Sequence, residues 1–328
     1  MNMKNKWIAV LLAIGMICAA FVGCDQQTGT DNPQGSPDST TSANGSQNDA
    51  PATKYGNFTT EGTPRTLEEI FKKELQHTED TFATGSSYSD DKIANIYKIA
   101  DYIANYEKYI EEYDAQEEFD ELYEETGFTM DFGFGAEMIK HYVSMSGETY
   151  DYTDEMPSML AFPKVSAAQT TCINAAMKAA ENLVKDGQTV SAINQSTPAS
   201  FSSLKSTDGP IYFALGSYHV MVDMSNVKRT GDSLTATVTF RIVDYYDWSE
   251  NGTEPEFTSY LDKLDEGYRT LLGEMVDMPT LETFCQADMA QLHYAGFAQN
   301  FLAHGTIVYN VSWTAGQTFD QATVQVVE

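Results

Sequence analysis

Residues 218–242 read YHVMVDMSNVKRTGDSLTATVTFRI and carry the clearest structural pattern in the chain. Apolar and polar side chains alternate over 218–224 and again over 234–242. A period of two is typical of β-strands that bury one face. The polar segment between the two runs contains Gly231 followed by Asp232, which favours a tight turn. These 25 residues therefore predict an antiparallel β-hairpin.

The regions around the hairpin differ in their periodicity. Spacings of three and four residues predict helices, and further alternation predicts strands. The expected helices cover 90–126, 166–185 and 287–303, and the expected strands cover 306–313 and 322–327. Helices followed by strands are typical of an α+β fold. We expect a helical lobe over 57–190, a linker over 191–209, and a β-rich lobe over 210–328 with a helix packed on an antiparallel sheet.

The N-terminus has the features of an export signal. Lys4 and Lys6 precede an apolar stretch over 7–22, which is shorter than the roughly 20 residues that span a membrane. The stretch ends in Phe21-Val22-Gly23-Cys24, which resembles the lipobox of bacterial lipoproteins. That resemblance implies a signal peptide over residues 1–23 and a lipid attached to Cys24.

The segment that follows, residues 24–56, is expected to be a disordered tether. Between residues 25 and 53 it has no aromatic residue and no Val, Ile or Leu. Such a segment cannot bury enough apolar area to offset the entropy lost on ordering. Together with the lipobox, it predicts an exported protein anchored by lipid to the outer face of the cytoplasmic membrane, on a Gram-positive-type cell surface.

The charge of the chain narrows the choice of partners. It has 48 acidic and 19 basic residues, and its net charge is −29. This balance argues against nucleic acid, because phosphate binding requires clustered Lys and Arg. It is compatible with divalent cations and cationic partners. Beyond Cys24, the only cysteines are Cys172 and Cys285, which are expected to form either one disulfide or two buried thiols.

The second hairpin strand ends in Asp244-Tyr245-Tyr246-Asp247-Trp248. Asp244 and Asp247 could bind a metal or share general acid–base work. Their spacing of three places them on opposite faces of an extended strand. They can therefore act together only if the chain turns between them.

A calcium loop is a separate expectation for the same region. Asp247, Ser249 and Asn251, followed by Gly252, match the beginning of such a loop, although its twelfth position is Thr258 instead of Glu. The alternative is a polar turn. The expected cofactor is Ca²⁺ or another divalent cation.

Three short motifs in the C-terminal third occur in order: Ala214-Leu215-Gly216-Ser217-Tyr218, then Asp244-x-Tyr246-Asp247-Trp248, then Leu292-His293-x-Ala295-Gly296-x-Ala298-x-x-Phe301-x-x-x-Gly305. The ordered set resembles a C-terminal domain of secreted polymorphic and LXG-type bacterial toxins. Its central motif also resembles colicin M-type enzymes that cleave lipid II.

The second resemblance implies that Asp244, Tyr246 and Asp247 act on a polyprenyl-pyrophosphate linkage with a divalent metal. Those enzymes carry a His-Arg pair after the second Asp, and this chain does not. His293 or Arg241 would have to replace that pair. His293 is therefore a candidate catalytic residue, and the alternative is a helix residue that packs at an interface.

Three functions stay open from the sequence. The chain could be a cell-surface lipoprotein with an acidic, tethered ectodomain of binding or adaptor type, whose partner is an envelope component or another protein. It could be a metal-dependent envelope hydrolase acting on a lipid II-like pyrophosphate. It could also be a retained toxin-type domain. The hydrolase requires Asp244, Asp247 and an imidazole or basic group to meet in one cleft.

Overall fold

The computed structural model describes residues 55, 57–126, 132–201, 210–262 and 264–327. All of them belong to one compact unit that spans residues 47–328. The expected signal peptide, Cys24 and nearly all of the expected tether lie outside the described residues. None of the helices in the described ranges is long and apolar enough to cross a membrane.

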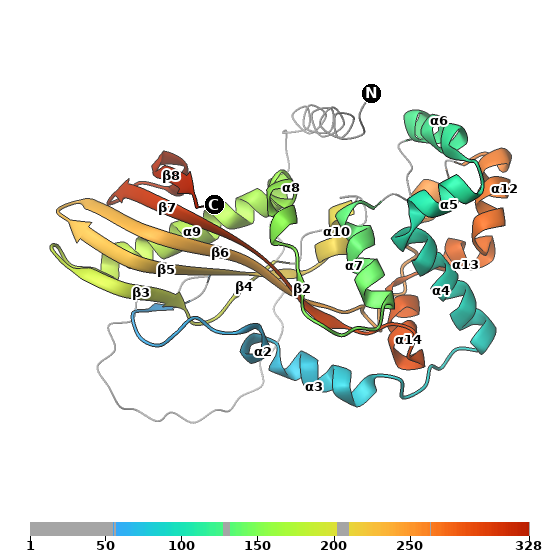
Figure 1. Ribbon diagram of the computed structural model, residues 1–328, viewed down its shortest axis with the longest axis horizontal. Coiled ribbons are helices and arrows are strands. Elements are labelled where there is room, and N and C mark those ends of the chain that lie inside the picture. Colours follow the sequence, from blue (N-terminus) through green and yellow to red (C-terminus); the bar gives the residue numbers. More distant parts are fainter. Residues whose placement is uncertain (1–54, 56, 127–131, 202–209, 263, 328) are drawn as a thin grey trace, which may run out of the picture. The chain divides into compact units, whose positions relative to one another are not determined.

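An eight-stranded sheet runs through the described residues (Figure 1). Its strands are β1 (Phe58–Thr59), β2 (Tyr150–Asp151), β3 (Thr189–Gln195), β4 (Ala199–Phe201), β5 (Tyr218–Thr230), β6 (Ser233–Tyr246), β7 (Phe301–Thr314) and β8 (Thr323–Val326). The order across the sheet is β1-β3-β5-β6-β7-β2, with β4 also paired to β5 and β8 to β7. All pairs are antiparallel except β2 with β7.

The predicted hairpin is confirmed, and so is the α+β fold. β5 and β6 pair up to Thr230 opposite Ser233, which leaves a two-residue turn. Gly231 begins that turn with φ +59°, a left-handed conformation that glycine adopts without steric cost.

The division into two lobes with a linker over 191–209 is wrong. β3 and β4 occupy part of that range and pair with β5. β1 and β2, from the expected helical lobe, belong to the same sheet. The polar composition misled the prediction, because polar Asn194 and Gln195 are buried here. Gln195 satisfies its polar groups by donating to the Tyr55 carbonyl and to Asp223 and by accepting from the Val222 N–H.

Helices cover both faces of the sheet and one end of its strands (Figure 1). They are α2 (Leu67–Ile70), α3 (Lys72–Thr81), α4 (Asp90–Ala104), α5 (Tyr106–Glu112), α6 (Gln116–Thr126), α7 (Phe134–Val143), α8 (Met156–Leu160), α9 (Pro163–Leu183), α10 (Pro210–Leu215), α11 (Thr258–Leu261), α12 (Glu266–Met275), α13 (Met278–Thr283) and α14 (Gln286–Ala295), with 3₁₀ turns at Thr153–Glu155 and Phe319–Gln321.

Two of the expected helices are shorter than predicted. The helix expected over 90–126 is divided into α4, α5 and α6, with Asp114 at φ +51° between the last two. The helix expected over 287–303 ends at Ala295, because Gly296 adopts φ +74° and caps it. Residues 301–303 therefore begin strand β7.

The two faces of the sheet bury different cores. Val222, Phe240 and Ile242 lie in the main core, which also contains Cys172 and Ile173 of α9. The opposite face buries a smaller cluster of Phe71, Met221, Val243, Tyr245 and Leu302, covered by α2 and the start of α3. Helices α4, α5, α12, α13 and α14 gather beyond the end of the sheet where β6 stops (Figure 1). That end carries the candidate site.

Candidate functional site

A cleft of about 520 Å³ lies where β5 begins and β6 ends. Its walls come from segments far apart in the sequence: Phe71 and Glu74; Tyr212, Phe213, Leu215, Gly216, Ser217 and His219; Asp244 through Ser249; and Gln286. Aromatic and acidic side chains dominate this lining. No Lys or Arg is present among the described residues that line it.

Both predicted carboxylates line this cleft. Asp244 lies in β6 and points to the same face as Ile242, whereas Asp247 follows Tyr246, the last residue of the strand. The cleft is lined by residues of both sheet faces, because it extends around the strand ends. In an uninterrupted strand, a spacing of three would put Asp244 and Asp247 on opposite faces. Because β6 ends at Tyr246, both residues line the same cleft.

The two carboxyl groups differ in their proton affinity. Asp244 is 7 % exposed, and burial raises its pKa well above the usual range, with a further rise from the charge of Asp247. Asp247 keeps surface that reaches solvent, yet burial of its carboxyl group and then the charge of Glu74 raise its pKa to about 6. Asp244 therefore releases its proton at a higher pH than an ordinary aspartate does, and Asp247 is mostly ionised at neutral pH.

His219 and Glu74 complete the polar lining, and the sequence did not single them out as site residues. His219 lies on the sheet face opposite Asp244 and packs edge-on against Phe71, with ring centroids 5.3 Å apart. Burial lowers its pKa, and the charge of Glu74 opposes that shift. Its buried Nδ1 has no hydrogen-bond partner among the described residues. Glu74 lines the cleft only because α3 packs on the sheet, and the local sequence around Glu74 does not predict that packing.

His293 does not line the cleft, so its predicted catalytic role is not supported by the geometry. It is 3 % exposed, and its Nε2 lies 3.0 Å from the Thr81 hydroxyl oxygen at the end of α3. Its ring also packs against Phe82, with centroids 5.5 Å apart. These contacts make His293 a packing residue between α14 and α3. The imidazole in the cleft is that of His219 instead.

Tyr246 lines the cleft as part of its wall. It is 5 % exposed, its hydroxyl donates to the Phe213 carbonyl at 2.9 Å, and its ring stacks on Phe301. Burial raises the pKa of its hydroxyl well above the usual range. These contacts fix the walls around Asp244 and leave Tyr246 little freedom to take part in proton transfer.

The structure gives limited support for a metal. Within the described ranges, no cluster of three His, Cys, Asp or Glu side chains could hold a metal ion. Asp247 and Ser249 line the cleft, whereas Asn251 does not. Gly252 has a packing role, since a Cβ there would lie 2.8 Å from Cβ of Gln286. The divalent cation, with Asp247, Ser249 and Asn251 as its ligands, stays a prediction.

Two further residues singled out by the sequence have structural positions. Arg241 forms an ion pair with Asp223 on the sheet face covered by α2, with 2.6 Å between Nη2 and Oδ2. It is therefore engaged away from the cleft and does not replace a catalytic Arg. Cys172 and Cys285 are buried free thiols and form no disulfide.

Comparison with known proteins adds nothing to this geometry. No family model, no curated protein and no solved structure matches the chain.

Proposed function

We propose that this chain is a lipid-anchored surface protein whose folded part binds the cationic group of a ligand, an ammonium or a guanidinium, in the cleft at the end of β5 and β6. The observation that carries the proposal is the lining: Glu74, Asp244 and Asp247 face the cleft, and no described Lys or Arg lines it. The lipobox at Cys24 and the polar tether after it support the placement at the cell surface.

The cleft is suited to a cation in two ways. Aromatic faces such as those of Phe71, Tyr212 and Trp248 attract cations through their ring quadrupoles. A bound cation would also favour the ionised form of Asp244, which burial now disfavours. Binding should therefore release a proton and become stronger as the pH rises. The net charge of −29 adds long-range attraction for cations.

We expect a lysine-rich peptide to bind the full chain, purified in mild detergent, with an affinity that rises between about pH 5 and about pH 8. The reason is that Asp247, whose pKa is about 6, loses its proton over this range. Asp247→Asn should weaken binding roughly tenfold at the upper pH and flatten the pH dependence. Isothermal titration calorimetry at several pH values measures both effects.

Glu254→Gln is the matched control, because Glu254 is exposed, does not line the cleft, and carries the same charge. A glutamate-rich peptide of equal length tests the sign of the charge. Equal weakening by Glu254→Gln and Asp247→Asn would mean that only the net charge attracts the peptide, and the cleft would not be the site.

A second candidate is the envelope hydrolase, acting on a lipid II-like pyrophosphate. The observation in its favour is that two carboxyl groups with different proton affinities share one cleft, as a general acid and a general base would. The same cleft lacks a cationic side chain for a pyrophosphate. This substrate would therefore need a divalent cation as counter-ion, which the predicted ligands Asp247, Ser249 and Asn251 would have to hold.

Incubation of the full chain with lipid II in calcium, magnesium or EDTA tests the second candidate. If it is a hydrolase, mass spectrometry should detect metal-dependent release of a phosphate-bearing headgroup, and Asp247→Asn should abolish that release. Intact lipid II in all three buffers would exclude this substrate and leave the binding function in place.

A further inference from the structure

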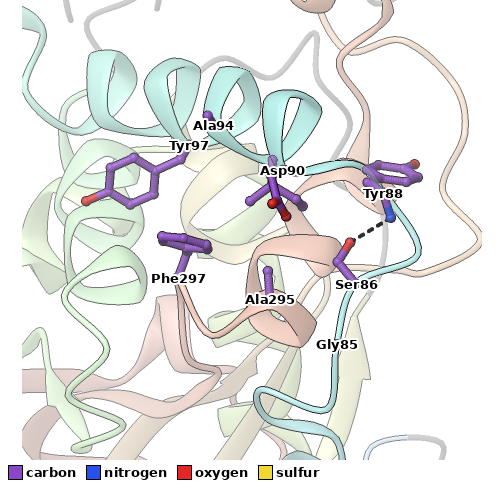
Figure 2. A pocket seen from close by; sticks show the side chains of 9 residues that line it. Gly85, Ser86, Tyr88, Asp90, Ala94, Tyr97, Ala295 and Phe297 are labelled. Carbon is purple, nitrogen blue, oxygen red and sulfur yellow. Dashed lines mark hydrogen bonds between the residues drawn. The ribbon is translucent and has the colours of Figure 1, made fainter.

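A second cavity, of about 490 Å³, lies at the C-terminal end of α14, whereas the cleft residue Gln286 begins that helix, and the cavity has no role in the proposed function. The first turns of α4 form one wall, the loop from Gly85 to Tyr88 forms another, and the segment after α14 forms the third (Figure 2). Asp90, Ile93, Ala94 and Tyr97 share one face of α4 because helical residues three or four apart are neighbours.

Two aromatic rings meet in this cavity. The rings of Tyr97 and Phe297 lie 5.9 Å apart between centroids and are inclined by 57°. Phe297 is 48 % exposed, so about half of the side chain is open to solvent on the cavity side of the helix end. Its N–H donates to the Leu292 carbonyl at 2.8 Å beyond the left-handed Gly296. Residues at this position of a helix cap commonly pack back on the helix, and Phe297 instead presents its ring to the cavity.

One carboxylate faces the same space. In the view of Figure 2, Asp90 lies between Tyr88 and the Tyr97–Phe297 pair. Its carboxylate has no ion-pair partner among the described residues. The nearby Lys92 pairs with the buried carboxylate of Asp288 at 3.2 Å, and its ammonium also lies 3.5 Å from the centroid of the Tyr88 ring. The charge of Lys92 is therefore already paired, whereas that of Asp90 is offset only by the positive end of the α4 helix dipole.

The loop that closes the cavity is held in place by hydrogen bonds. Gly85 donates its N–H to the Tyr294 carbonyl at 2.9 Å, and the Ser86 hydroxyl donates to Oε1 of Gln291 at 2.6 Å. The Ser86 oxygen in turn accepts the Tyr88 N–H, as Figure 2 shows. A cavity with fixed walls binds without the entropic cost of ordering them.

From these contacts we infer that the cavity between α4 and Phe297 is a second binding site, for an organic ammonium ion that carries apolar substituents. The rings of Tyr97 and Phe297 would contact the substituents, and Asp90 would balance the charge. Quaternary ammonium ions are recognised elsewhere by aromatic faces combined with an acidic group. The site does not depend on the cleft and involves different residues.

The chemistry of the lining decides against other ligand classes. An anion would be repelled by Asp90, with no unpaired cation in the described lining to attract it. A sugar requires several converging hydrogen-bond partners. The Ser86 hydroxyl already donates to Gln291, and the Tyr88 hydroxyl is hydrogen-bonded to Lys92 and Asp288, which leaves Asp90 and the Tyr97 hydroxyl as the polar groups of the lining side chains.

The probe is choline, compared with neohexyl alcohol, in which carbon replaces the quaternary nitrogen. Titration of the full chain by calorimetry should show saturable choline binding and much weaker binding of the alcohol. Asp90→Asn and Phe297→Leu should each weaken choline binding roughly threefold to tenfold. Both side chains are exposed at the cavity, so neither change should unfold the protein, and the thermal melting temperature checks that.

Two matched variants control the experiment. Asp91→Asn removes the same charge from the neighbouring, exposed position of α4. Tyr123→Leu removes an exposed ring from α6. Equal binding of choline and the alcohol, or an affinity that Asp90→Asn leaves unchanged, would overturn the site. Binding that is lost only in Asp247→Asn would also overturn it and would assign the ammonium to the cleft.

Discussion

Arg241→Met is expected to lower the free energy of unfolding by about 3–5 kcal/mol, which is the cost of removing one partner from a buried ion pair. The Asp223 carboxylate is 7 % exposed and lies 2.6 Å from the Arg241 guanidinium. Burial raises the pKa of Asp223, and the charge of Arg241 opposes that shift. Without Arg241 the carboxylate would be buried without a counter-charge, with the Gln195 N–H as its remaining hydrogen-bond donor. Urea denaturation of the full chain measures the change.

The double variant Asp223→Asn with Arg241→Met is the informative control. It removes both charges and keeps an amide oxygen that can accept the Gln195 N–H, so it should recover most of the lost stability. Lys228→Met, at an exposed position of the same sheet, removes a positive charge without a buried partner and should change stability by less than about 1 kcal/mol. If Arg241→Met is as mild as Lys228→Met, the ion pair does not stabilise the fold, and Arg241 becomes available for another role.

Asp244→Asn is expected to make the protein more stable than the unchanged chain at about pH 8, and this advantage should shrink towards about pH 4. The folded state keeps the Asp244 proton because its pKa is raised by burial. The unfolded state loses that proton above the usual pKa of about 3.9. Below that value Asp244 is protonated in both states and does not lower the free energy of unfolding. As the pH rises above it, only the unfolded state loses the proton, and the free energy of unfolding falls by up to about 1.4 kcal/mol per pH unit.

Melting temperatures of both proteins across this pH range test the prediction. Asp154→Asn is the control, since Asp154 is an exposed residue that does not line the cleft. Parallel curves for Asp244→Asn and the unchanged chain would mean that Asp244 ionises equally in the folded and unfolded states. In that case the cleft would hold an ordinary ionised carboxylate, and the acid–base pairing with Asp247 would be lost.

The hairpin could be predicted from the sequence because alternation is a local property. β5 and β6 occur where the alternation of 218–224 and 234–242 placed them. β3 was missed because buried Asn194 and Gln195 resemble linker residues until their hydrogen-bond partners are known. The breaks between α4, α5 and α6 were missed because neither Asn105 nor Asp114 is a strong helix breaker by type.

The candidate site was predictable only in part, for a similar reason. The sequence singled out Asp244 and Asp247 at the end of a strand but placed them on opposite faces unless the chain turns, and the structure has both lining the same cleft. The other polar residues of the cleft, Glu74 of α3 and His219 at the start of β5, reach it only through tertiary packing, which the local sequence does not show. His293 was selected for its imidazole, and packing against Thr81 and Phe82 instead places it in an interface.

Strand β7 also has a consequence for the order in which the chain can fold. It pairs with β6 along its whole length, with β8, and in parallel with β2, which lies about 150 residues earlier. A ribosome must therefore synthesise almost the entire chain before the sheet can close. Until residues 301–314 emerge, β6 has an open edge and the core has no complete wall. Until β7 pairs with it, this open edge leaves the growing chain exposed to proteases and to aggregation.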